Sequence, residues 1–198
     1  MDRPAIRLLS WLAALGILGV IALGSTGCSR QPKPVSNWTI PEAKQFQEFP
    51  LYWLGETYAG LPLTSMRLTT DGNGVTHATF NYGDPSRTGQ GSWLPPLKID
   101  IQPYCGYSPF EFLSHDEYWH EDWNAEPIEV HVRGVNGYLQ RYSSTNSSLF
   151  LWSGGSSIHV GTWKSNLEVE EAAKSLTPIA DENASATQPL PPSTPTSC

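Results

Sequence analysis

One short stretch of the chain, His115–Asp122 with the sequence HDEYWHED, concentrates side chains that can bind a metal ion or transfer protons. If this stretch is helical, Asp116 and His120 lie four residues apart and share a face. Together with His115 they are the candidate ligands of a divalent metal, which would indicate a metal-dependent hydrolase. The spacing departs from HExxH, and no second ligand group is evident elsewhere in the sequence. The alternative interpretation is a solvated acidic helix end, with no metal and no cofactor.

Other patterns that carry chemistry are missing from the sequence. There is no GxSxG, SxxK, P-loop or GxGxxG, so neither a serine nucleophile nor a nucleotide cofactor is indicated. His77, His131 and His159 stand singly in predicted strands, where a histidine is more often a satisfied sheet residue than a catalytic base. We therefore predict no catalytic residue and favour a protein that is not an enzyme.

The charge balance argues against nucleic acid as a partner. The chain of 198 residues carries 12 Lys and Arg against 19 Asp and Glu, a net charge of -7, and its basic residues form no cluster. Phosphate binding requires concentrated positive charge. A hydrophobic content of 39% is enough for a core, and the length suits one domain with appendages.

The first 27 residues have the composition of a signal peptide. Arg3 and Arg7 precede an apolar run over residues 8–23, and small residues follow it. A charged start, a short apolar segment and small residues at the end are typical of secretory signals, whereas a membrane span needs about 20 apolar residues. The sequence thus predicts export across the cytoplasmic membrane.

The end of that segment resembles the lipobox of bacterial lipoproteins through Thr26, Gly27 and Cys28, although Ser25 stands where the family prefers Leu. The resemblance implies diacylglycerol on Cys28, a tether over residues 28–37, and a protein held on the outer face of the membrane. The alternatives are a plain signal peptide with an incidental cysteine and an uncleaved N-terminal anchor.

Two further cysteines, Cys105 and Cys198, do not suggest a disulfide framework. Cys105 is expected to be a small buried apolar residue and Cys198 to be free. Residues 180–198 are rich in Pro, Ser and Thr with almost no core-forming residue, so this tail is predicted to be disordered.

Between the tether and the tail, residues 38–179 are predicted to form one α+β domain. Hairpins are expected at Asp71–Gly74 and at Gly154–Gly155, and Leu97–Gln102 should be a strand with its apolar residues facing the core.

A helix is predicted to begin at Ser165 and Glu168, which have capping-box spacing, and to end at Pro178. Its apolar stripe is formed by Val169, Ala172, Ala173 and Leu176. A second helix is expected from Ser108 to about Tyr118, and a shorter one after Pro41. We predict an antiparallel sheet of six or seven strands with short helices on one face.

Two phrases resemble other bacterial proteins. Tyr52–Gly55 with Gly60–Thr64 is similar to the opening of uncharacterised secreted lipoproteins. Gly134–Gly137, Leu149–Trp152 and Ala172–Leu176 are similar to the last part of a widespread extracytoplasmic domain, which supports the topology only. Some such domains resemble lipoprotein-sorting and anti-sigma-factor regulators, which implies a cell-envelope signalling regulator as one alternative.

The leading functional hypothesis is a non-enzymatic binding or interaction module, held at the membrane by its lipid and recognising an unknown protein or small ligand. Exposed aromatic residues would provide its surface, and the candidates are Trp93, Trp119, Trp123 and Trp163. The alternative is that these tryptophans pack in the core, which is the more frequent place for such a residue. A signalling regulator and a metal-dependent hydrolase are the alternatives.

Overall fold

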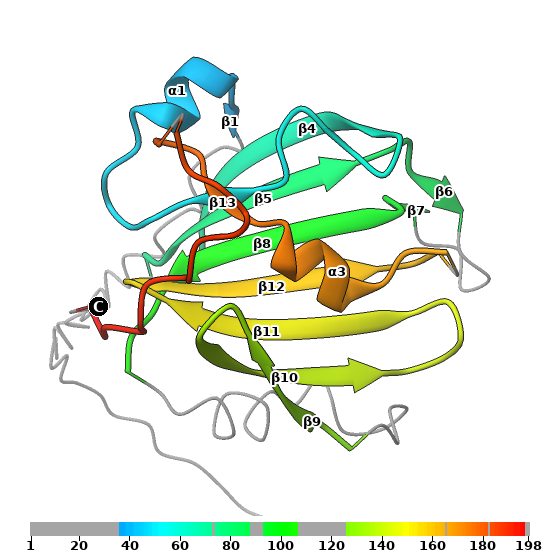
Figure 1. The fold of residues 1–198 in the computed structure, drawn as a ribbon. Helices are drawn as coiled ribbons and strands as arrows, with labels where there is room; N and C mark the ends of the chain where they lie inside the picture. Colours follow the sequence, from blue (N-terminus) through cyan, green and yellow to red (C-terminus); the bar gives the residue numbers. More distant parts are fainter. Residues whose placement is uncertain are drawn as a thin grey trace, which may run out of the picture.

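The computed structural model describes residues 36–72, 74–87, 93–106, 126–164, 166–181 and 183–196. Their main element is a curved antiparallel sheet in the strand order β1-β4-β5-β8-β12-β11-β10-β9, with β3 paired to β4 (Figure 1). The strands of this sheet are β1 (Ser36–Asn37), β3 (Thr57–Tyr58), β4 (Leu61–Thr70), β5 (Thr76–Tyr82), β8 (Leu97–Pro103), β9 (Ile128–Val132), β10 (Val135–Arg141), β11 (Ser147–Ser153) and β12 (Ser156–Thr162).

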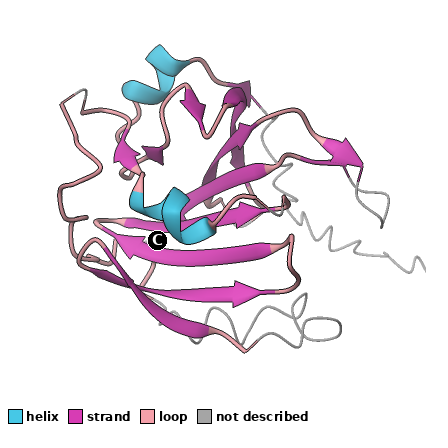
Figure 2. Cartoon of the chain, turned by 45° about the vertical axis from the view of Figure 1, so that its right-hand side comes forward, coloured by secondary structure: helices cyan, strands magenta, loops and turns pink. Residues whose placement is uncertain are grey.

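Smaller elements stand around this sheet. A two-stranded sheet joins β2 (Tyr52–Trp53) to β13 (Thr177–Pro178), and another joins β6 (Ser86–Arg87) to β7 (Trp93–Leu94). The described helices are α1 (Ile40–Lys44) and α3 (Val169–Lys174), and α3 lies across β12 and β11 (Figures 1 and 2).

The prediction of an antiparallel sheet with a helix on one face is confirmed, but the α+β class and the strand number need correction. The main sheet has nine strands, against the six or seven predicted, and the fold is mainly β within the described ranges. The two helices there have five and six residues. Helices this short contribute little without tertiary packing, so the sheet determines the architecture.

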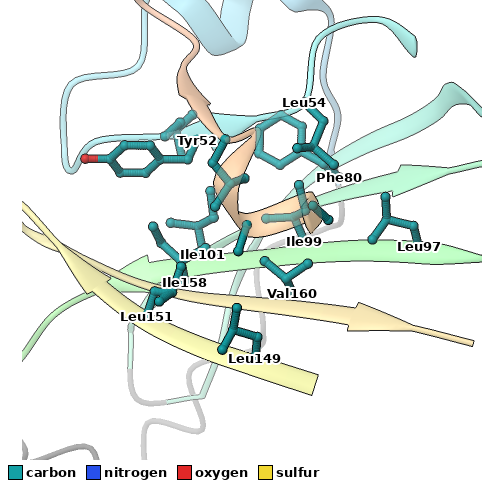
Figure 3. Packing of buried hydrophobic residues seen from close by; sticks show 14 of the residues in the cluster. Tyr52, Leu54, Phe80, Leu97, Ile99, Ile101, Leu149, Leu151, Ile158 and Val160 are labelled. Atoms are coloured by element: carbon teal, nitrogen blue, oxygen red, sulfur yellow. The ribbon is translucent and has the colours of Figure 1, made fainter. Parts of the chain in front are cut away.

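The core lies on one face of the sheet, as the alternation in β8 predicted. Leu97, Ile99 and Ile101 are fully buried, and the intervening residues of β8 point to the other face. In the register with β12, Ile101 stands opposite Ile158 and Ile99 opposite Val160, so the same face continues across the strands (Figure 3). A period of two thus separates an apolar face from a polar one.

The turns between strands follow the predicted chemistry. Gly74 (φ 86°) closes the β4–β5 hairpin, where the main-chain N–H of Val75 donates to Asp71 Oδ1 at 2.9 Å. Gly154 (φ 56°) closes the β11–β12 hairpin. These positive φ angles suit glycine, so both predicted hairpins are confirmed.

Helix α3 differs from its prediction at both ends. It begins at Val169 with Glu168 as its N-cap, and it ends at Lys174, before Pro178, which joins β13. The cause is local: Glu168 has extended backbone and makes no side-chain capping bond, so packing rather than a capping box sets the start of the helix. The predicted stripe is confirmed, because Val169, Ala172, Ala173 and Leu176 are buried. The short helix after Pro41 is also confirmed, as α1.

The C-terminal segment corrects the prediction of disorder. Within residues 183–196, Leu190 is only 3% exposed, and its main-chain N–H donates to the Arg133 carbonyl oxygen at 2.8 Å. The main-chain N–H of Thr194 donates to the Gly154 carbonyl oxygen at 2.6 Å, and the segment, red in Figure 1, passes the ends of β8 and β12. Composition predicted disorder because the segment has no core of its own, but it docks on the core of the domain.

Cys105 also differs from its prediction, because it is disulfide-bonded rather than a free buried cysteine. A disulfide requires only two sulfur atoms at the right separation, and the spacing of cysteines in a sequence does not reveal that separation.

Several sequence predictions fall outside the described residues. Residues 1–35 include the predicted signal peptide and Cys28, and residues 107–125 include the helix predicted from Ser108 and the HDEYWHED stretch. Among the helices that the structure does describe, none has the length and apolar character to cross a membrane.

Candidate binding groove on the polar face of the sheet

The candidate site lies on the face of the sheet opposite the core. In the register of β4, β5 and β8, Arg67 stands opposite Thr79, and Thr79 opposite Asp100. Asn81 likewise stands opposite Lys98. Because alternate residues point to opposite faces, the buried alternation of β5 and β8 places these polar side chains together on the other face.

A groove of about 340 Å³ opens where the polar face meets the connection between β5 and β8, which carries β6 and β7. This volume falls within the usual range for small-molecule sites. The groove is lined by Thr64, Ser65, Arg67, Thr69, Thr79, Asn81, Pro85, Trp93, Leu94, Pro95 and Lys98.

Trp93 is the most unusual residue of this groove. Its side chain is 69% exposed, and only one other large hydrophobic residue in the described ranges, Ile128, is comparably exposed at 55%. Strand β7 holds the backbone of Trp93 by pairing it with Arg87. An exposed aromatic side chain beside a polar groove is a frequent feature of binding surfaces.

The polar side chains of the groove are partly held in place by hydrogen bonds. Asn81 Nδ2 donates to Ser65 Oγ at 2.8 Å, and Thr64 Oγ1 donates to the Gly83 carbonyl oxygen at 3.0 Å. Arg67 is different: it is exposed, and no carboxylate among the described residues forms an ion pair with it. The groove therefore offers a cation that an external ligand can pair with.

A row of bonded polar groups extends from the groove across the sheet. Lys98 Nζ lies 2.7 Å from Asp100 Oδ2, and Thr79 Oγ1 donates to Asp100 Oδ1 at 2.7 Å. Burial alone would raise the pKa of Asp100, but the hydrogen bond with His159 and the charge of Lys98 lower this pKa to about 2. Asp100 is thus a carboxylate at neutral pH.

The row continues through His159 to Ser148. His159 Nδ1 lies 3.6 Å from Asp100 Oδ2, and His159 Nε2 lies 2.9 Å from Ser148 Oγ, while Phe150 stacks on the imidazole with the ring centres 4.6 Å apart. The order is that of a Ser-His-Asp triad. However, Ser148 is only 3% exposed, so this residue is almost fully enclosed by its neighbours. The row is better explained as cross-strand support for the polar face.

A second hollow lies further along the same face. Two adjoining cavities of about 220 Å³ and 200 Å³ share His77, Gln102 and Ser157 in their walls. The first also contacts Phe150, and the second contacts Trp152. In the wall of the second cavity, His77 Nε2 lies 3.5 Å from Asp71 Oδ2. The polar face is therefore hollowed here as well as at the Trp93 groove, and among the described residues in the walls of these two cavities no aromatic side chain is as exposed as Trp93.

The structure tests only part of the predicted site. Among the candidate tryptophans, Trp93 is exposed, whereas Trp163 is half-buried and lies against Gly161. The candidate metal ligands His115, Asp116 and His120 lie outside the described residues, as do Trp119, Trp123 and Cys28. Within the described part of the chain, no group of three His, Cys, Asp or Glu side chains is placed to hold a metal ion.

Sequence reasoning missed the bonded row of Asp100, His159 and Ser148. These residues lie on three strands, and only the strand pairing brings them together. The available signal in the sequence was the alternation of apolar and polar residues along each strand, which placed Asp100 and His159 on the face away from the core.

No family model, no curated protein and no solved structure matches this chain.

Proposed function

We propose that the protein is a non-enzymatic, extracytoplasmic binding module, anchored in the membrane by lipid on Cys28, with its ligand site in the Trp93 groove. The observation that carries the proposal is the 69% exposed Trp93 in the wall of a polar groove of about 340 Å³. Export is supported by the disulfide at Cys105, because disulfides persist in oxidising compartments and are rare in the cytosol.

The chemistry of the groove favours an acidic carbohydrate as ligand. The apolar C–H face of a sugar ring can pack on an aromatic ring such as that of Trp93. Its hydroxyl groups need both donors and acceptors, and the amide of Asn81 and the hydroxyl of Thr69 provide them. Arg67, exposed and without a carboxylate partner in the described residues, would pair with a carboxylate of the ligand.

Calorimetric titration with two disaccharides tests this ligand class. N-acetylglucosaminyl-N-acetylmuramic acid carries a carboxylate, and chitobiose is its neutral counterpart. Trp93→Ala should weaken the binding of both sugars by tenfold or more, because both lose the aromatic ring. Arg67→Ala should weaken only the acidic sugar, and Ile128→Ala, the matched exposed control, should bind like the wild type. Absence of binding at millimolar sugar, or unchanged binding by Trp93→Ala, would refute the glycan site.

The anchor is tested separately by metabolic labelling with a palmitate analogue. The wild type should be labelled and recovered with membranes, whereas Cys28→Ala should be neither. Equal labelling of both proteins would show that Cys28 is not the lipidated residue, whatever the groove binds.

The two alternatives make different predictions. A hydrolase that uses His115, Asp116 and His120 requires a stoichiometric metal in the purified protein, and metal analysis that finds none excludes it. A signalling regulator should co-purify with a membrane protein. If that protein binds a surface other than the Trp93 groove, Trp93→Ala should still co-purify with it.

A further inference from the structure

The C-terminal segment lies beside the chain at Cys105. The main-chain N–H of Thr196 donates to the Tyr104 carbonyl oxygen at 2.7 Å, and Thr196 Oγ1 donates to the same oxygen at 3.2 Å. Next to this contact, a Cβ built on Gly106 would lie 3.5 Å from Pro195 Cβ. Residues 104–106 and 195–196 are therefore in direct contact on both sides of Cys105.

The segment is held there by the β11–β12 turn as well. The main-chain N–H of Gly154 donates to the Pro192 carbonyl oxygen at 3.2 Å, and Gly154 forms a bridge with Ser193. The main-chain N–H of Tyr104 in turn donates to the Gly155 carbonyl oxygen at 2.8 Å. The turn thus connects the C-terminal segment and the end of β8 to each other.

We propose that the disulfide partner of Cys105 is Cys198, and that this bond fastens the C-terminal segment to the sheet as a strap. The chain has three cysteines, and Cys105 is disulfide-bonded. Cys198 follows Thr196 by two residues, a span of at most about 7 Å. A disulfide joins Cα atoms about 4.4–6.8 Å apart, so a cysteine two residues after the Tyr104–Thr196 contact is within reach.

This pairing leaves Cys28 available for the thioether of a lipid. Bond formation converts two thiols into one disulfide and releases two protons and two electrons. The electrons pass to the disulfide of a thiol oxidase of the extracytoplasmic space by thiol–disulfide exchange. The strap would also fix one wall of the second hollow, because Tyr104 and Cys105 line that cavity.

Peptide mapping of the full-length protein tests the pairing. Tryptic cleavage after Lys98, Arg133 and Lys174 places Cys105 in peptide 99–133 and Cys198 in peptide 175–198. Without reductant, with free thiols blocked by alkylation, mass spectrometry should find these two peptides linked, and reductant should separate them. Free Cys105, a link to the peptide that contains Cys28, or a link between two copies of peptide 99–133 would each overturn the proposal.

Thermal unfolding gives an independent readout. Cys198→Ser, Cys105→Ser and the double variant should melt at one common temperature, below that of the oxidised wild type, because each removes the same bond. Cys28→Ser should melt like the wild type. If Cys28→Ser shares the loss and Cys198→Ser does not, the pairing is with Cys28. Neither result depends on sugar binding, so the proposed disulfide and the proposed ligand site can be refuted independently of each other.

Discussion

Arg133 Nε donates a hydrogen bond to the main-chain carbonyl oxygen of Gln188 at 2.7 Å, and a second guanidinium nitrogen donates to the same oxygen. The guanidinium also donates to the carbonyl oxygen of Ser185 at 3.1 Å, to that of Lys174 at 3.2 Å and to that of Leu176. One side chain in the β9–β10 turn thereby satisfies acceptors in the C-terminal segment and at the end of α3. The planar fork of Arg suits such multiple contacts, and Lys cannot reproduce them.

Arg133→Ala should loosen the C-terminal segment. It leaves four carbonyl oxygens without their charged donor, so we expect a loss of about 2–3 kcal/mol in the free energy of unfolding. Faster amide hydrogen exchange over residues 185–196 should accompany this loss. Arg141→Ala is the control, because Arg141 makes only exposed ion pairs with Glu168 and Glu170, which contribute about 0–1 kcal/mol. Unchanged exchange in Arg133→Ala would show that the segment is held by other contacts.

Gly137 in β10 is predicted to tolerate no side chain. A Cβ at this position would lie 2.5 Å from Leu151 Cδ2 and 2.5 Å from the Phe150 carbonyl oxygen. The backbone oxygen cannot move without breaking the β10–β11 pairing, so Gly137→Ala should cost about 2–3 kcal/mol or more in urea unfolding. At Gly72 a Cβ meets nothing within 4 Å, so Gly72→Ala should change stability little. Equal stability of the two variants would contradict the close packing at Gly137.

The hydroxyl of Tyr82 should contribute to stability through the segment after β2. It accepts a hydrogen bond from the main-chain N–H of Leu54 at 2.9 Å and donates to the Gly55 carbonyl oxygen at 3.2 Å. Burial raises the pKa of Tyr82, so the hydroxyl stays protonated at neutral pH. Tyr82→Phe leaves the buried Leu54 N–H without this partner, and we expect a loss of about 1–3 kcal/mol in urea unfolding. A phenylalanine variant as stable as the wild type would show that water replaces the hydroxyl.

Local patterns in the sequence were sufficient to predict much of the sheet. The alternation of Leu97, Ile99 and Ile101 predicted both the strand and its buried face, since a period of two admits only one assignment. The glycines at the two hairpins predicted where strands reverse, because few other residues adopt positive φ. These features depend on neighbours in sequence, which is why they could be found without a structure.

Features that depend on distant contacts could not be predicted. The C-terminal segment has the composition of a disordered tail, and its order depends on Arg133 and Gly154, which lie far away in sequence. The same holds for the row from Asp100 to Ser148, which exists only through strand pairing. The residue type made Trp93 one of four candidates but did not decide between surface and core, and the groove beside it needed the pairing of β4, β5 and β8.

The ionised Asp100 should make stability depend on pH in a defined window. Its pKa of about 2 in the folded protein lies below the ordinary value of 3.8. The unfolded chain therefore takes up a proton at a higher pH than the folded protein does. The contribution of Asp100 is complete above about pH 5 and is lost as pH falls from about 4 toward 2. Allowing for the partial solvent access of the side chain, we expect a contribution of about 1–2 kcal/mol.

Urea unfolding of the wild type and Asp100→Asn at pH 6 and pH 2.5 measures this contribution. At pH 6 the variant should be less stable, and at pH 2.5 the difference between the two proteins should shrink, because the carboxyl group is then partly protonated in both states. Lys98→Met, which removes the cation 2.7 Å from Asp100 Oδ2, should move the acid loss of stability to higher pH. If the difference in the free energy of unfolding between the wild type and Asp100→Asn is the same at both pH values, the charge of Asp100 does not contribute to stability.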